Sequence, residues 1–94
     1  MVDPPVNTVL PTVTGKPQVG HVLAVSFGEW SGLPMLTYQW RRGVTNIDGA
    51  TAPIRVLAAL DKGEMISCVI TATNAAGAAS AESLPVGPIV EGRA

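Results

Sequence analysis

The stretch that decides the fold is SCVITATNAAG, residues 67–77, in which apolar and polar residues largely alternate before a glycine. Alternation predicts a strand with one buried face, because successive side chains of a strand point to opposite sides. We expect this strand over residues 65–74. The side chains on its inward face are Ile66, Cys68, Ile70 and Ala72. A hairpin connection at residues 74–77 then leads into a last strand over residues 78–86.

Prolines and glycines divide the rest of the sequence into short runs. The 94 residues include eight prolines and ten glycines. They recur at intervals of about 8–12 residues, which is typical of an all-β sandwich or barrel. The other expected strands cover residues 21–27, 36–41 and 54–57, and the proline-interrupted residues 2–14 are an edge strand or a linker that turns into one. We therefore predict an all-β chain of about seven antiparallel strands without crossover helices.

Alternation also assigns inward faces to two of these strands. In residues 21–27 the inward side chains are Leu23, Val25 and Phe27. In residues 36–41 they are Leu36, Tyr38 and Trp40. Residues 54–57 allow two assignments, in which either Ile54 and Val56 or Arg55 and Leu57 point into the core.

Four motifs occur in an order that resembles a known family. They are GHVLAV (residues 20–25), GEWSG (28–32), YQWRRG (38–43) and DKGEMISC (61–68). Over residues 5–88 the chain resembles the bacterial and bacteriophage immunoglobulin-like (Ig-like, Big-type) domains. The resemblance implies an immunoglobulin-like antiparallel β-sandwich, with Trp40 at the centre of its third strand and Cys68 in its sixth.

The chain departs from the disulfide-bearing immunoglobulin pattern. In that pattern the partner of Cys68 would lie near Val25 or Phe27, and neither is a cysteine. Cys68 is the only cysteine, so no disulfide can form within the chain. A disulfide contributes about 2–5 kcal/mol in a small domain, and we expect an apolar contact with Trp40 in its place. The expected structural core consists of Leu23, Val25, Trp40, Ile66, Cys68 and Ile70.

Composition and motifs argue against several classes of function. Charged residues make up 14% of the chain and the net charge is −1, which provides no cluster of cations for nucleic acid. No apolar run reaches the roughly 20 residues of a membrane-spanning helix, so we expect no membrane insertion. The acids are scattered and His21 is the only histidine, so we expect no metal and no cofactor. Catalytic motifs are absent from the sequence, and we expect no enzyme.

Two side chains allow a functional and a structural interpretation. Trp30, in the GEWSG loop, is the candidate binding residue, because an exposed indole can stack on a sugar ring. Alternatively, it covers one end of the fold by packing on Leu33, Pro34 or the start of the chain. The adjacent residues Arg41 and Arg42 could grip an acidic partner, or one of them pairs with an acid such as Asp61 while the other is solvated. The resemblance implies a structural pair of Asp61 with Arg55 or Arg41.

We expect a linker at residues 1–5, one immunoglobulin-like domain at 6–88 and a C-terminal tail at 89–94. The resemblance implies a non-enzymatic module of a phage virion, in its tail or capsid, or of a bacterial surface or secreted protein. Its expected partners are neighbouring domains of a larger protein, with weak contact to host cell-surface carbohydrate. The alternative is a carbohydrate-binding accessory module of a secreted bacterial hydrolase.

Overall fold

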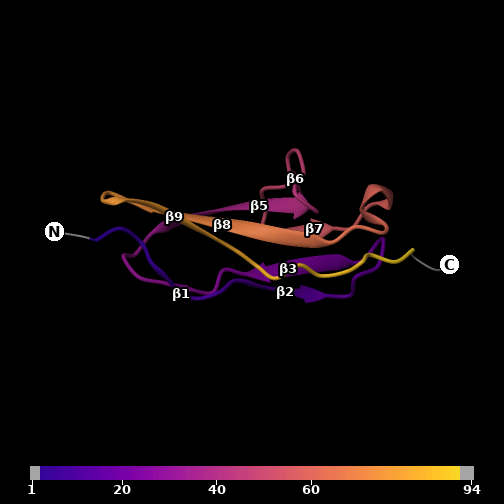
Figure 1. The fold of residues 1–94 in the computed structure, drawn as a ribbon, viewed down its shortest axis with the longest axis horizontal. Coiled ribbons are helices and arrows are strands. Elements are labelled where there is room, and N and C mark those ends of the chain that lie inside the picture. Colours follow the sequence, from indigo (N-terminus) through magenta and orange to yellow (C-terminus); the bar gives the residue numbers. More distant parts are fainter. Residues whose placement is uncertain (1–2, 92–94) are drawn as a thin grey trace.

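The computed structural model describes residues 3–91, and over these residues the fold is all-β (Figure 1). The strands are β1 (Asn7–Val9), β2 (Thr12–Gly15), β3 (Val22–Ser26), β4 (Glu29–Trp30), β5 (Met35–Arg42), β6 (Thr45–Asn46), β7 (Ile54–Val56), β8 (Ile66–Asn74) and β9 (Gly77–Glu82). A single 3-10 turn, η1 (Ala59–Asp61), precedes β8. The predicted all-β character is confirmed. The described chain has nine strands rather than about seven, in part because the short segments β4 and β6 each form a strand of two residues.

The strands form antiparallel sheets arranged in two layers. One sheet has the order β6-β5-β8-β9 and another has the order β2-β3-β7, while β1 pairs with β4. Figure 1 shows β5 and β8 in one layer and β2 and β3 in the other, all running along the long axis of the molecule. The segment after β9 passes from the first layer to the second, so the chain end lies beside the three-stranded sheet.

The longest pairing, between β5 and β8, places Trp40 directly opposite Cys68. Side chains that face each other across an antiparallel pair lie on the same side of the sheet. Both side chains are 0% exposed, so that side is the core. The indole Nε1 of Trp40 donates a hydrogen bond to the carbonyl oxygen of Ala52 at 2.7 Å. The largest side chain of the core is therefore fixed in orientation as well as buried.

The core between the layers is apolar. Its buried members are Leu23, Trp40, Ile47, Leu57, Ile66, Cys68, Ile70 and Ile89. Val25 packs against this cluster and is partly buried. The expected inward position of Phe27 is wrong, since this side chain is 47% exposed. The strand ends at Ser26, and alternation no longer applies in the turn that follows.

The two assignments left open for residues 54–57 are resolved by burial. Arg55 and Leu57 point inward, whereas Ile54 and Val56 lie on the exposed outer face of β7. Arg55 is tolerated inside because its guanidinium group finds a carboxylate there, as described below.

The packed chain extends past residue 88. Ile89 is buried, and its N–H donates to the carbonyl oxygen of Glu64 at 3.0 Å. Val90 forms a parallel bridge with Gln18 in the first half of the chain. The N–H of Val19 donates a hydrogen bond to the carbonyl oxygen of Val90 at 2.9 Å. Of the expected tail at 89–94, residues 89 and 90 thus take part in the fold, and residues 92–94 lie outside the described residues.

The expected linker at residues 1–5 is also in contact with the fold where it is described. Pro5 is buried, and the carbonyl oxygen of Asp3 accepts a hydrogen bond from Asn74 at 2.8 Å. Residues 1 and 2 lie outside the described residues.

We expect Trp40→Ala to lower the free energy of unfolding by about 3–5 kcal/mol, because it removes the largest side chain of a core that no disulfide supports. Urea denaturation followed by circular dichroism measures this change. The control is Val44→Ala, at an exposed position between β5 and β6, which should change stability by less than about 0.5 kcal/mol. A loss of under 1 kcal/mol for Trp40→Ala would contradict the central role assigned to the indole.

Candidate functional site

Trp30 lies in β4, which pairs with β1, and its indole is used within the fold. The side chain is partly buried and packs against the core cluster. Its Nε1 donates to the carbonyl oxygen of Phe27 at 2.8 Å. Part of the side chain and its only polar group therefore have partners in the chain, which leaves only part of the indole for a ligand.

The glycines of the GEWSG loop have structural reasons. A Cβ on Gly28 would come within 2.0 Å of the carbonyl oxygen of Val9, so the close approach of β1 requires glycine. A Cβ on Gly32 would come within 2.7 Å of the side-chain nitrogen of Asn74. Both residues have a positive φ, at 77° and 86° respectively, which glycine adopts without strain. The loop is thus shaped by its contacts with the chain start and with the end of β8.

Asn74 ties three segments together at the end of the molecule where the described chain begins. Its Nδ2 donates to the carbonyl oxygens of Asp3 at 2.8 Å and Gly32 at 3.0 Å. Its Oδ1 accepts from the N–H groups of Ala76 at 2.9 Å and Gly77 at 3.2 Å, which closes the β8–β9 hairpin. We call this end, formed by residue 3 and residues 31–35 and 74–77, the N-terminal pole.

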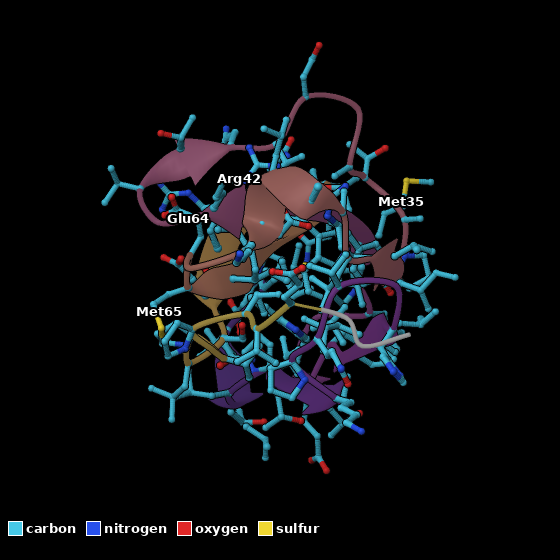
Figure 2. The ribbon with its side chains drawn as sticks, turned by 90° about the vertical axis from the view of Figure 1, so that its right-hand side faces the viewer. Met35, Arg42, Glu64 and Met65 are labelled. Carbon is cyan, nitrogen blue, oxygen red and sulfur yellow. The ribbon has the colours of Figure 1, made fainter. Side chains whose placement is uncertain are left out.

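The N-terminal pole carries two exposed apolar side chains, Leu33 and Met35, whose exposure the sequence pattern did not predict. Leu33 is 98% exposed and has a φ of 49°, an uncommon conformation for leucine. Met35 is 77% exposed, and Figure 2 shows it at the periphery, pointing away from the body of the molecule. Leu33 is therefore not one of the residues on which Trp30 packs. An exposed apolar side chain on a hydrogen-bonded loop and a second one at the start of β5 form a candidate contact surface.

A second candidate site is a charged cluster around the buried carboxylate of Asp61. Arg42 donates to Oδ1 through Nε at 2.9 Å and Nη2 at 2.8 Å. Arg55 Nη2 donates to Oδ2 at 2.9 Å, and the N–H of Ala58 donates to the same oxygen at 2.9 Å. The carboxylate is fully covered, whereas both guanidinium groups keep some exposure. Every contact of this cluster is internal, which fits a structural role.

The partners of Asp61 correct one expectation and support another. Arg55 is a partner, as expected, and of the two adjacent arginines the one that pairs with Asp61 is Arg42 rather than Arg41. Arg41 lies on the opposite face of β5 and pairs with Glu82 at 3.4 Å. Alternation could have identified Arg42, because it shares the inward face of β5 with Trp40.

The environment of Asp61 sets its ionisation. Burial by itself raises the pKa of this carboxyl group. The N–H of Ala58 and the guanidinium groups of Arg42 and Arg55 outweigh burial and hold the pKa below its ordinary value. The group is therefore ionised in the folded chain at neutral pH.

Cys68 is a buried free thiol rather than a nucleophile. Burial raises the pKa of the thiol to about 11, against the smaller opposing effect of a hydrogen bond from the backbone of Gln39. A thiol with this pKa stays protonated at neutral pH, and the protonated form is not nucleophilic. His21, the only histidine, lies exposed between β2 and β3. The two residues therefore do not form a catalytic pair.

A shallow apolar groove opens at one side of the molecule between the two layers. Its volume is about 210 Å³, and its lining residues are Leu10, Pro11, Thr12, Val13, Leu84, Pro85 and Val86. The groove carries no formal charge, so it offers neither a general acid nor a general base.

Within residues 3–91, no three His, Cys, Asp or Glu side chains gather where they could hold a metal ion. The same residues contain no helix with the length and apolar character that crossing a bilayer demands. Comparisons with models of protein families, with curated proteins and with solved structures found no match.

We expect Asp61→Asn to lower the free energy of unfolding by about 3–5 kcal/mol at neutral pH, because two partly buried guanidinium groups lose their anion. Urea denaturation measures the change. The matched control is Glu64→Gln, which also removes one negative charge but at an exposed position. A loss no larger than that of the control would contradict the structural role of the cluster.

The same pair of variants tests the direction of the pH dependence. The folded chain holds the pKa of Asp61 below that of the unfolded chain, in which an aspartate has a pKa of about 3.9. The stabilisation is therefore present above that pH and is lost as the pH falls through the folded pKa. Between pH 5 and pH 2, we expect the stability of Asp61→Asn to fall less steeply than that of the original chain or of Glu64→Gln.

Proposed function

We propose that the chain is a non-enzymatic immunoglobulin-like β-sandwich module that serves as a spacer and contact element in a larger protein. The observation that carries this proposal is the pairing of Trp40 with Cys68 in a dry core between two sheets of antiparallel strands. The motifs that resemble immunoglobulin-like domains fall on β3, β4, β5 and β8, which supports the same topology. The buried, protonated thiol gives no support to a catalytic role.

The shape of the molecule supports a spacer. Its extents are 55 × 22 × 17 Å, and the described chain starts and stops at opposite ends of the long axis (Figure 1). The strands run along that axis. A change in length therefore requires neighbouring strands to slide past one another, and the hydrogen bonds between them oppose this. A module of this form keeps neighbouring domains a fixed distance apart.

We propose a phage virion, in its tail or capsid, or a bacterial surface or secreted protein as the setting of this module. The chain folds around a free thiol, and its stability therefore needs no oxidising compartment. This property suits proteins that assemble in a bacterial cytosol, as virions do. The neighbouring domains in the same gene product distinguish the settings, because a tail or capsid domain supports the virion and a hydrolase domain contradicts it.

In this proposal the N-terminal pole is the contact surface. Leu33 projects from a loop that Asn74 holds in place, and Met35 projects from the first residue of β5, directly after that loop. Both side chains can therefore be presented to a neighbouring domain with little loss of conformational entropy. Weak contact with host carbohydrate is a further part of the proposal, and Trp30 would have to supply it with the part of its ring that remains exposed.

The spacer role predicts a fixed distance between the two ends. Spin labels introduced at Asp3→Cys and Val90→Cys should give one narrow distance distribution of the order of the 55 Å long axis in pulsed electron paramagnetic resonance. Cys68 is buried and should remain unlabelled. The control pair Asp3→Cys and Ala76→Cys lies at one pole and should give a short distance. A broad distribution for the first pair would argue against a spacer.

The alternative, a carbohydrate-binding accessory module, predicts a different result for Trp30. A binding platform gives a saturable change in tryptophan emission when soluble glycans are added, and Trp30→Phe abolishes that change while Trp40 continues to report the fold. Because the indole of Trp30 is packed and hydrogen-bonded, we expect no saturable change at micromolar glycan and only partial quenching by iodide. A tight, saturable response that Trp30→Phe removes would favour the alternative.

A further inference from the structure

One edge of the four-stranded sheet, β9, differs from the opposite edge of that sheet and from both edges of the three-stranded sheet. An unpaired edge exposes backbone N–H and C=O groups, and proteins usually blunt such edges with short strands, prolines or lysines. The opposite edge, β6, has two residues, and β7 has three and follows Pro53. β2 has four residues and is bounded by Pro11 and Pro17. In contrast, β9 has six residues, GAASAE, with no proline and no lysine.

The direction of the free groups on β9 follows from its pairing with β8. The pairing partners include Ala72 with Ala79 and Thr71 with Ser80. Further along, Ser83 N–H donates to the carbonyl oxygen of Cys68 at 2.9 Å, so residue 83 directs its backbone groups toward β8. Backbone groups alternate along a strand, so residues 77, 79 and 81 also point toward β8. The groups of Ala78, Ser80 and Glu82 point away from the sheet.

We propose that β9 pairs antiparallel with β9 of a second copy of this chain, about a two-fold axis at Ser80. In this register Ser80 lies opposite Ser80 of the second copy, and Ala78 lies opposite Glu82. All three outward N–H groups and all three outward C=O groups of each strand then have partners. A shift by two residues in either direction leaves part of the edge unpaired, so the register is defined. The result is one continuous sheet across two molecules, and this inference does not depend on the proposed function.

Charge supports a second copy as the occupant of this edge. Glu82 is the only charged residue of β9. In the proposed register it lies opposite Ala78 rather than opposite another Glu82, so no like charges face each other. Its carboxylate is also held on its own sheet by Ser67 at 2.6 Å and Arg41 at 3.4 Å, which directs it away from the edge.

Two of the three outward positions of the edge carry small residues. The side chains of Ala78 and Ser80 are small and exposed. Pro4 contacts the strand near Gly77, where its Cβ would lie 3.7 Å from a Cβ built on the glycine. Gly77 shares the inward face of β9 with Ala79, so Pro4 lies beneath the sheet, and β1 also comes close to β9.

The test is the mass of the chain in solution as a function of concentration, measured by analytical ultracentrifugation. We expect the mass to rise toward twice 9.7 kDa with increasing concentration. Ser80→Lys places two like charges at the two-fold axis and should remain monomeric at the same concentrations. Ser80→Thr keeps the hydroxyl group and should dimerise. The matched control is Thr12→Lys, which adds the same charge at an exposed position of β2 and should also dimerise.

Amide hydrogen exchange distinguishes this interface from others. Dimerisation through β9 should slow the exchange of the Ala78, Ser80 and Glu82 amides at least tenfold between dilute and concentrated samples. A chain that stays monomeric at millimolar concentration overturns the proposal, even if a foreign strand binds at β9. A dimer that persists in Ser80→Lys, or that leaves these three amides in fast exchange, also overturns it.

Discussion

The fold depends on the burial of Trp40 beside Cys68, where β5 and β8 pair in the middle of the four-stranded sheet. Without a covalent link between the layers, the two sheets are held together by apolar contact and by hydrogen bonds alone. An indole fills much of that space, and its N–H is directed to the carbonyl oxygen of Ala52. This bond links β5 to the segment that leads into β7, and β7 belongs to the other layer. One side chain therefore contributes both to the volume of the core and to the connection between its walls.

The Asp61 cluster has a comparable role nearer the end of the molecule that lies opposite the N-terminal pole. Arg42 comes from the four-stranded sheet and Arg55 from the three-stranded sheet, so a single buried carboxylate bridges the two layers. The arrangement is costly to disturb, because each partner is poorly solvated. It also orders η1, since the N–H of Ala58 bonds to the same carboxylate. The layers are thus joined by an apolar contact in the centre and by an ionic one near one end.

Part of this structure could be predicted from the sequence because it follows from alternation within single strands. The inward positions of Leu23, Trp40, Cys68 and Ile70 are of this kind, and all four side chains are buried. Alternation fails where a strand ends, and Phe27 shows this. β3 ends just before Gly28, where β1 approaches closely, and this contact between distant parts of the chain leaves no local pattern in the sequence.

The candidate site was harder to predict for the same reason. The exposure of Leu33 results from the way Asn74 fixes a loop more than forty residues away in sequence, at the carbonyl oxygen of Gly32. The prolines before Ile89 predict a tail, yet this side chain is buried because the segment after β9 crosses to the other layer. In both cases a contact between distant segments decides whether an apolar residue is exposed.

The bonds between Val90 and the segment at residues 17–19 have a mechanical consequence. They join the last described part of the chain to its first third, with Val19 and Val90 running in the same direction. Tension applied to the two ends acts nearly along these two segments and loads the hydrogen bonds between them in shear, so several bonds must break together. The same bonds would separate one at a time if the chain were peeled from a single end. The molecule is therefore stiffer against stretching along its length than against unzipping.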